Sequence, residues 1–162
     1  MNHLDWCTHV QFEGDNDILT RELFDVNMRL FHKNKEYKEL VLLCCDYIKK
    51  CASTTKDGYK TPHGWSGANA GIPFNIIAFK DKEEIITWIN PKIIGQSKET
   101  KTVLTNCGSL TLEKPIRVTR SATIDVSFYD LSGNYTEWKN IPGSPGYTIE
   151  HEILHNRGIL LW

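Results

Sequence analysis

The sequence predicts an α+β fold in which antiparallel strands pack around a buried C-terminal helix, with an amphipathic helix in the N-terminal part. Apolar residues recur at helical spacing over residues 36–51, and alternating apolar segments joined by short turns occupy much of residues 74–138. Because these strand-like segments follow one another without regular intervening helices, an α+β arrangement is favoured over a doubly wound sheet.

Length and composition indicate a single domain over residues 1–162. The 19 basic and 20 acidic residues give a formal charge of −1, which does not favour nucleic acid or an anionic membrane as a partner. No membrane-spanning run or signal peptide is recognisable, so we expect a cytoplasmic location. The five cysteines do not have the spacing of a disulfide framework.

Two helices are expected before the strands. The segment "DILTRELFDVNMRLFHKN" has a loose helical pattern that begins near Asp17. The next segment, "EYKELVLLCCDYIKKC", has the apolar stripe of a helix packed on a core. Its expected buried residues are Tyr37, Leu40, Val41, Cys44, Ile48 and Cys51. We interpret the two cysteines of this stripe as small buried hydrophobes, since free cysteine is among the most buried residue types.

The middle of the chain alternates between a glycine-rich loop and strands. Residues 53–64 and the following "GWSGANAGIP" are expected to be loop, without the spacing of a nucleotide-binding motif. The segments "FNIIAFK" and "EIITWINP" predict two strands around the turn "DKEE", the second ending at Pro91. The segment "RVTRSATIDVSFYDLSGNYTEW" predicts two or three more, with Ile124, Val126 and Phe128 on one face and a turn at "LSGN".

The last predicted element is a helix with recognisable end signals. Ser144 is expected as its N-cap, Pro145 at its first position and Gly158 just past its end. Its apolar residues lie on more than one side, which is typical of a buried helix.

The C-terminal helix contains the clearest chemical motif of the sequence. His151 and His155 are four residues apart, so both imidazoles project from one face and can converge on one cation. Glu152 follows the first histidine and is placed to take a proton from water near that cation. The alternative is a pair of histidines that pack in the core; the glutamate and the buried helix favour the metal-binding interpretation.

A metal site of this kind usually has a third protein ligand. The segment "NRGILLW" after His155 contains no His, Cys, Asp or Glu, so the donor is expected upstream. Cys107 in "LTNCGSL" is the first candidate, because it lies between strand-like segments and off any helical stripe. A buried strand cysteine is the alternative for this residue, and His63 is the second candidate ligand.

Three motifs resemble those of the peptide deformylase family. "GWSGANAGIP", "NCGSL" and "HEILH" are similar to the family forms GΦGΦAAxQ, EGCLS and HExDH, in the same order and at a similar separation. "INPKIIG" with Ser97 and "RVTRSATIDVSFYDLSG" resemble intervening family segments. The resemblance covers about residues 60–160.

The resemblance implies a metal-dependent hydrolase that removes the formyl group from N-formylmethionyl peptides of nascent proteins and releases formate. It implies Fe(II), for which Zn(II), Ni(II) or Co(II) can substitute, held by Cys107, His151 and His155. Glu152 would be the general acid and base, and the backbone N–H of Gly108 would help to stabilise the oxyanion. The expected substrate-binding residues are Trp65, Ser66, Asn106, Tyr147 and Thr148.

The sequence departs from the family at several positions. Ala70 or Gly71 replaces the glutamine of the first motif, whose amide helps to hold the oxyanion; losing one such donor costs about 10²–10³ in rate. We hypothesise that Asn69 or Asn106 takes its place. Thr105 and Asn106 replace the Glu and Gly of the cysteine motif, and Leu154 replaces the acidic residue of HExDH, which affects groups that support the ligands.

The sequence also suggests a source and a partner. The resemblance implies that this chain is a divergent deformylase with a minimal C-terminus, of bacteriophage or organellar type. If a phage encodes the protein, we expect it to act in the cytoplasm of the bacterial host. We expect a monomer acting on nascent peptides at the ribosome exit. Two alternatives remain open: a metalloprotease of the HExxH type with a different upstream ligand, and a deformylase-like protein that binds metal without turnover.

Overall fold

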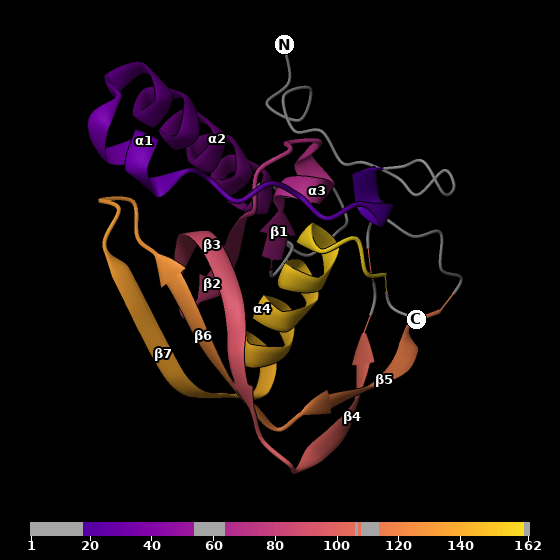
Figure 1. Ribbon diagram of the computed structural model, residues 1–162. Coiled ribbons are helices and arrows are strands. Elements are labelled where there is room, and N and C mark those ends of the chain that lie inside the picture. The colour runs from indigo at the N-terminus through magenta and orange to yellow at the C-terminus, as the bar shows by residue number, and fades with distance from the viewer. Residues whose placement is uncertain (1–17, 54–63, 106, 108–113, 161–162) are drawn as a thin grey trace.

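A computed structural model describes residues 18–53, 64–105, 107 and 114–160, and it contains two antiparallel sheets and several helices (Figure 1). The larger sheet has the order β1 (Gly64–Ser66), β2 (Ile76–Asp81), β3 (Glu84–Gln96), β6 (Thr123–Tyr129), β7 (Tyr135–Pro142). The smaller sheet pairs β4 (Thr100–Thr105) with β5 (Ile116–Ser121). The helical elements are η2 (Ile18–Thr20), α1 (Met28–Lys33), α2 (Lys35–Ser53), α3 (Gly67–Ala70) and α4 (Gly143–Asn156). The predicted α+β class with antiparallel strands and a C-terminal helix is confirmed.

Strand β2 is the centre of the core because both of its faces are buried. Successive side chains of a strand point to opposite faces. Ile76 and Ala78 belong to the cluster that includes the buried residues of α2. Ile77 and Phe79 belong to the cluster that includes residues of α4. The larger sheet is therefore a layer between α2 and α4, which explains why "FNIIAFK" is apolar without a clean alternation.

Helix α2 confirms the helix predicted over residues 36–51, with a corrected buried face. Leu40, predicted to be buried, is 49% exposed. Cys44 is only partly buried, whereas its neighbour Cys45 is fully packed in the core. Burial, together with the charge on a Cys44 thiolate, raises the pKa of the Cys45 thiol to about 12. The buried residues of the helix are Val41, Cys45, Ile48, Cys51 and Ala52.

The helix predicted from Asp17 is interrupted over about half of its length. Only η2 and α1 are helical, and the residues between them form isolated bridges to other parts of the chain. The Leu23 N–H donates to the Asn156 carbonyl at 2.7 Å, and the Phe24 N–H donates to the Pro73 carbonyl at 2.9 Å. Because distant segments supply the hydrogen-bond partners, an extended backbone replaces the helix that the local pattern suggested.

Pro91 does not end the third strand, in contrast to the prediction. Strand β3 continues to Gln96, with a register shift against β6 between Ile89 and Lys92. Asn90, just before the proline, has a φ of 51°. Pro91 therefore lies at a bulge, where the ladder is interrupted and a residue without an N–H is tolerated.

The glycine-rich segment "GWSGANAGIP" is ordered rather than an irregular loop, which corrects another expectation. It forms β1 and the single helical turn α3. Ser66 caps this turn, since its hydroxyl accepts from the Asn69 N–H at 3.1 Å and the Ser66 N–H donates to Asn69 Oδ1 at 3.2 Å. Gly71 ends the turn with a φ of 70°, a conformation that glycine adopts without a steric penalty.

The predicted hairpin near residue 130 is confirmed by the pairing of β6 with β7. Ile124, Val126 and Phe128 point into the core on the same face as α4. Trp88 stacks on Phe128 with ring centroids 4.0 Å apart and meets Trp138 edge-on at 5.0 Å. Aromatic pairs in these geometries add to the stabilisation from burial, so they join β3, β6 and β7 beneath the helix.

Helix α4 begins earlier than predicted. Pro142 precedes its first turn and makes no side-chain capping hydrogen bond, whereas Ser144, the expected N-cap, lies within the first turn. Gly143, with a φ of 60°, lets the chain pass directly from β7 into the helix. The C-terminal signal was correct, since Gly158 has a φ of 71° and its N–H donates to the His155 carbonyl at 3.0 Å.

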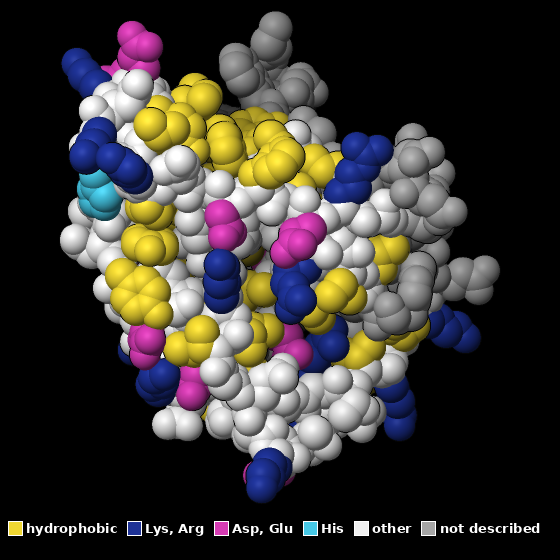
Figure 2. Space-filling model, viewed as in Figure 1, with side chains coloured by type: hydrophobic (Ala, Val, Ile, Leu, Met, Phe, Trp, Pro, Cys, Tyr) yellow, Lys and Arg dark blue, Asp and Glu magenta, His cyan; other side chains and the backbone are white. Residues whose placement is uncertain are grey.

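The surface agrees with the near-neutral composition. Figure 2 shows acidic and basic side chains side by side near the middle of one face, and hydrophobic side chains toward the end that carries α1 and α2. Helix α2 carries two exposed leucines, Leu40 and Leu43. Across the described residues, the apolar stretches of the helices are too short to span a lipid bilayer.

A matched pair of substitutions tests the buried layer between the sheet and α4. Ile77→Val is expected to lower the free energy of unfolding by about 0.5–1.5 kcal/mol, because Ile77 is fully buried and its lost methyl group leaves a cavity. Ile94→Val makes the same chemical change in β3, where the side chain is 44% exposed, and should stay within about 0.5 kcal/mol of wild type. Urea denaturation measures both, and equal effects would contradict the layered arrangement.

Candidate metal centre

Two histidines of α4 face the same point. His151 and His155 are one helical turn apart, and their Nε2 atoms are 3.0 Å from each other. His155 is only 1% exposed, and His151 is partly buried. The i, i+4 spacing therefore produces the convergence that the sequence predicted.

Cys107 completes the cluster from a different part of the chain. It lies just beyond the end of β4 and is 3% exposed. Its Sγ atom is 3.2 Å from His155 Nε2. The ligand atoms of Cys107, His151 and His155 all lie within 4.8 Å of one another. The structure thus brings together the three residues proposed as ligands.

The donor set fits a divalent transition metal. Donors bound to one ion at about 2.0–2.3 Å lie on the order of 3–4 Å apart, which is close to the spacing observed here. Burial, together with the positive charge of Arg120, lowers the pKa of His151 to about 4. His151 is therefore neutral near pH 7, the form in which imidazole binds metal. One thiolate with two imidazoles suits Fe(II) or Zn(II).

Glu152 lies beside this cluster and is almost completely buried, with 6% of its surface exposed. Burial raises the pKa of its carboxyl group to about 8, and a hydrogen bond from the Ser66 side chain opposes the rise. Among the described residues, none forms a hydrogen bond with its Oε2 atom. A carboxyl group in this environment can exchange a proton near neutral pH, as a general acid and base requires.

Gly64 in β1 has no side chain, and the Glu152 side chain occupies the space that a Cβ atom at position 64 would need. A Cβ atom at position 64 would lie 2.7 Å from Cγ2 of Thr148 and 2.9 Å from Oε1 of Glu152. Both distances are shorter than normal contacts, so a side chain here would displace α4 or the carboxylate. The first glycine of "GWSGANAGIP" is therefore needed for close packing of β1 against the helix.

Gly64→Ala is expected to lower the free energy of unfolding by about 1–3 kcal/mol through overpacking, and to reduce turnover by moving Glu152. Thr148→Ser removes the methyl group that the new side chain would strike. In the double variant, part of the lost stability should return, which thermal unfolding of the four proteins of the cycle would measure. Purely additive effects would contradict the predicted contact.

Ser66 and Asn69 occupy the turn next to Glu152. The Ser66 hydroxyl is 2.6 Å from Asn69 Oδ1, and both residues are buried. The side-chain oxygen of Asn69 is thus used to hold the turn. The sequence had suggested Asn69 as an oxyanion donor, and that role stays a prediction alongside this structural one.

The residues predicted to bind the substrate are not part of the cluster formed by Cys107, His151 and His155. Trp65 packs in the cluster around α2. Tyr147 and Thr148 are half-buried on α4, one turn before His151. Their part in a substrate pocket stays a prediction. His63, Asn106 and Gly108 lie outside the described residues.

A buried ion pair next to the cluster was not anticipated from the sequence. Glu150 on α4 and Arg120 on β5 have side chains that are 8% and 12% exposed, with Oε2 and Nε 3.9 Å apart. Gln96 Nε2 donates to Glu150 Oε1 at 3.5 Å. Burial raises the pKa of Glu150, and Arg120 opposes the rise. The only sequence signal was the acidic residue before His151 on a helix expected to be buried.

Comparison with known families decides which family the chain belongs to. The sequence profile described as polypeptide deformylase matches residues 46–162, which is well over half of the chain and includes all three proposed ligands. The chain belongs to the polypeptide deformylase family. The enzymes of this family are metal-dependent hydrolases that remove the formyl group from the N-terminus of polypeptides. The family resemblance read from the three motifs is therefore confirmed.

Solved deformylases share the fold at low sequence identity. The peptide deformylase of Thermotoga maritima has a TM-score of 0.75 and 21% identity, covering 95% of this chain and 94% of that chain. A probable peptide deformylase from Synechococcus phage S-SSM7 has a TM-score of 0.69 and 23% identity, covering 96% and 97%. A class I type b enzyme from Acinetobacter baumannii, bound to Met-Ala-Ser, has a TM-score of 0.74 and 19% identity, covering 96% and 95%. No curated protein matches the chain.

Membership of the deformylase family also bears on the alternative that the chain is a metalloprotease. It favours hydrolysis of a formyl group over the cleavage of peptide bonds by a metalloprotease. It also agrees with a cysteine ligand. Cys107 lies in the cluster with the two histidines, whereas the metalloprotease alternative assigns no role to this residue.

Proposed function

We propose that the chain is a deformylase that holds one Fe(II) ion through Cys107, His151 and His155 and removes the formyl group from N-formylmethionyl peptides of nascent proteins. Zn(II), Ni(II) or Co(II) would substitute for iron. The observation that carries the proposal is the convergence of a thiolate and two imidazoles beside a buried carboxyl group. Residues 1–162 would form one catalytic domain.

A divalent metal at this site supplies Lewis acidity, which lowers the pKa of water and polarises a carbonyl oxygen. Glu152 is the residue that moves protons. Its carboxylate takes a proton from the attacking water and returns it to the departing amine, so that formate and a free N-terminus result. The buried position of Glu152 excludes bulk water from this exchange.

The remaining roles are assigned from the family motifs. The backbone N–H of Gly108 would donate to the oxyanion, together with the side-chain amide of Asn69 or Asn106. Tyr147 and Thr148 would form the wall of the methionine pocket, and Trp65, Ser66 and Asn106 would line the peptide. The Met-Ala-Ser peptide named for the Acinetobacter baumannii enzyme supports a ligand that begins with methionine.

The setting follows from the substrate. Nascent chains carry the formyl group, so the enzyme would act in the cytoplasm near the ribosome exit, and as a monomer. The structural likeness to a protein of Synechococcus phage S-SSM7 supports a phage type of deformylase, which would work in the cytoplasm of a bacterial host.

A formate-release assay on a formyl-Met peptide tests the proposed function. Protein purified under argon and loaded with Fe(II) should release one formate per peptide, and metal analysis should find one ion per chain. Release of amino acids from within the peptide would support the metalloprotease. Bound metal without formate would support the binding protein that has lost turnover.

Two substitutions test the replacement of the motif-one glutamine. Asn69→Asp keeps the oxygen that holds Ser66 and removes the amide donor, so it should lower kcat if Asn69 serves the oxyanion. Asn106→Ala should lower kcat if that residue serves instead. The formate assay measures both, and near-normal rates for both variants would overturn the substitution hypothesis.

A further inference from the structure

Asn156 connects the metal helix to two neighbouring elements. It is the last residue of α4, directly after His155, and is 1% exposed. Its Oδ1 atom accepts from the Ala68 N–H in α3 at 3.1 Å. Its Nδ2 atom donates to the Ile76 carbonyl at 2.9 Å and to Asn75 Oδ1 at 3.2 Å. The side-chain oxygen and nitrogen are thus both used in a buried setting.

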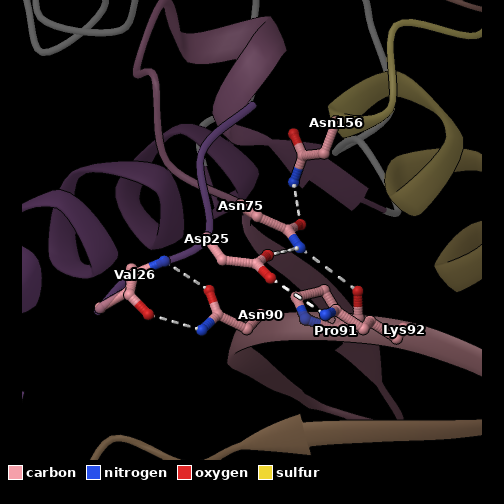
Figure 3. A network of polar contacts seen from close by, with 7 residues as sticks. All are labelled: Asp25, Val26, Asn75, Asn90, Pro91, Lys92 and Asn156. Carbon is pink, nitrogen blue, oxygen red and sulfur yellow. Dashed lines mark hydrogen bonds and ion pairs between the residues drawn. The ribbon is translucent and has the colours of Figure 1, made fainter. Parts of the chain in front are cut away.

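The network extends from Asn156 to the N-terminal segment and the bulge of β3, as Figure 3 shows. Asn75 Nδ2 donates to Asp25 Oδ1 at 2.9 Å, and Asp25 forms an ion pair with Lys92 at 3.0 Å. Asn75 Nδ2 is also 3.4 Å from the Pro91 carbonyl. The end of α4 is therefore held by several segments that are distant in the sequence.

The position of Asn156 matters for the metal because consecutive helical residues point about 100° apart. His155 faces Cys107 and His151, while Asn156 faces α3 and the start of β2. Helix α3 in turn continues from β1, which packs against Glu152. One side chain thus links the segment carrying a metal ligand to the segment beside the proton-transferring carboxyl group.

We propose that Asn156 is a positioning residue of the metal centre, which fixes His155 relative to α3 and the start of β2 through its three side-chain hydrogen bonds. The inference rests on the proposed ligand set of Cys107, His151 and His155. Without this side chain, the Ala68 N–H and the Ile76 carbonyl would lose buried partners, and the last turn of α4 would shift to find others. His155 moves with that turn.

Asn90 offers a matched control in the same network. Its side chain makes two buried hydrogen bonds, accepting from the Val26 N–H at 2.7 Å and donating to the Val26 carbonyl at 2.8 Å, and neither involves α4. Glycine tolerates its φ of 51°. Asn90→Gly should therefore lower stability without moving His155.

The test uses Co(II)-loaded protein, whose thiolate charge-transfer and visible bands report the geometry of the donors. Asn156→Ala should alter the visible bands and weaken Co(II) affinity by about 10–100-fold, measured by competition with a chelator. Asn90→Gly should lower the melting temperature and leave the visible bands and the Co(II) affinity unchanged. If Asn156→Ala does not fold, Asn75→Ala, which removes one of the three bonds, should give a smaller shift in the same direction.

Two outcomes would contradict the proposal and they are distinguishable. In the first outcome, the wild-type protein shows a thiolate band, and the Asn156 and Asn75 variants have the same bands and the same Co(II) affinity. Asn156 would then have only a general structural role. A wild-type protein without any thiolate band would overturn the metal centre of the proposed function, and this inference with it.

Discussion

Glu152→Gln is expected to lower kcat by about 10²–10⁴-fold while the metal stays bound. Glutamine has nearly the same shape, but its amide cannot accept a proton from water and return it to the amine. The ligand atoms of Cys107, His151 and His155 lie in a cluster that does not include this carboxyl group. The formate assay would measure the rate, and metal analysis of the same sample would measure occupancy.

Ser127→Ala provides a control for Glu152→Gln, because Ser127 is also a buried polar residue but lies in β6. This variant should retain turnover. A Glu152→Gln protein that keeps near-normal kcat would show that another group moves the proton. A variant that loses its metal would show instead that Glu152 supports the ion.

Cys107→Ala is expected to have the second large effect, a loss of bound metal and with it of turnover. The substitution removes one of three protein donors, so affinity should fall by more than the roughly 10–100-fold that the loss of a supporting group costs. The thiolate charge-transfer band of the Co(II)-loaded protein should disappear. Chelator competition and absorption spectroscopy would measure the two effects.

Cys51→Ala is the matched control for Cys107→Ala. Cys51 is also buried, at 1% exposure, but it packs in the cluster around α2. Its loss should lower stability slightly and leave the cobalt spectrum unchanged. Wild-type metal content in Cys107→Ala would mean that the ion is held by a different set of residues.

Local patterns predicted elements wherever the partners of a residue lie close in sequence. The helix over residues 36–51 and the hairpin around "LSGN" follow from spacing and turn chemistry. So does the convergence of His151 and His155, because four residues make about one helical turn. Cys107 required the family motifs in addition, since no local rule indicates which distant segment will approach α4.

Two of the errors share one cause, which is hydrogen bonding between distant segments. The segment after Asp17 has a helical pattern but pairs with Pro73 and Asn156 in an extended form. The sequence predicts that the strand ends at Pro91, but the bulge at Asn90 accommodates the proline within the strand. Both alternatives gain buried hydrogen bonds whose partners are remote in the sequence.

The sequence by itself determined the α+β class, the family and the shared face of the two histidines on the last helix, since these depend on short spacings and motifs. Only the tertiary structure decided that Cys107 approaches His155, that Arg120 and Glu150 form a buried pair, and that Asn156 joins α4 to α3 and β2. The reason is physical. Such contacts depend on how whole elements pack, and packing brings together residues that no local periodicity relates.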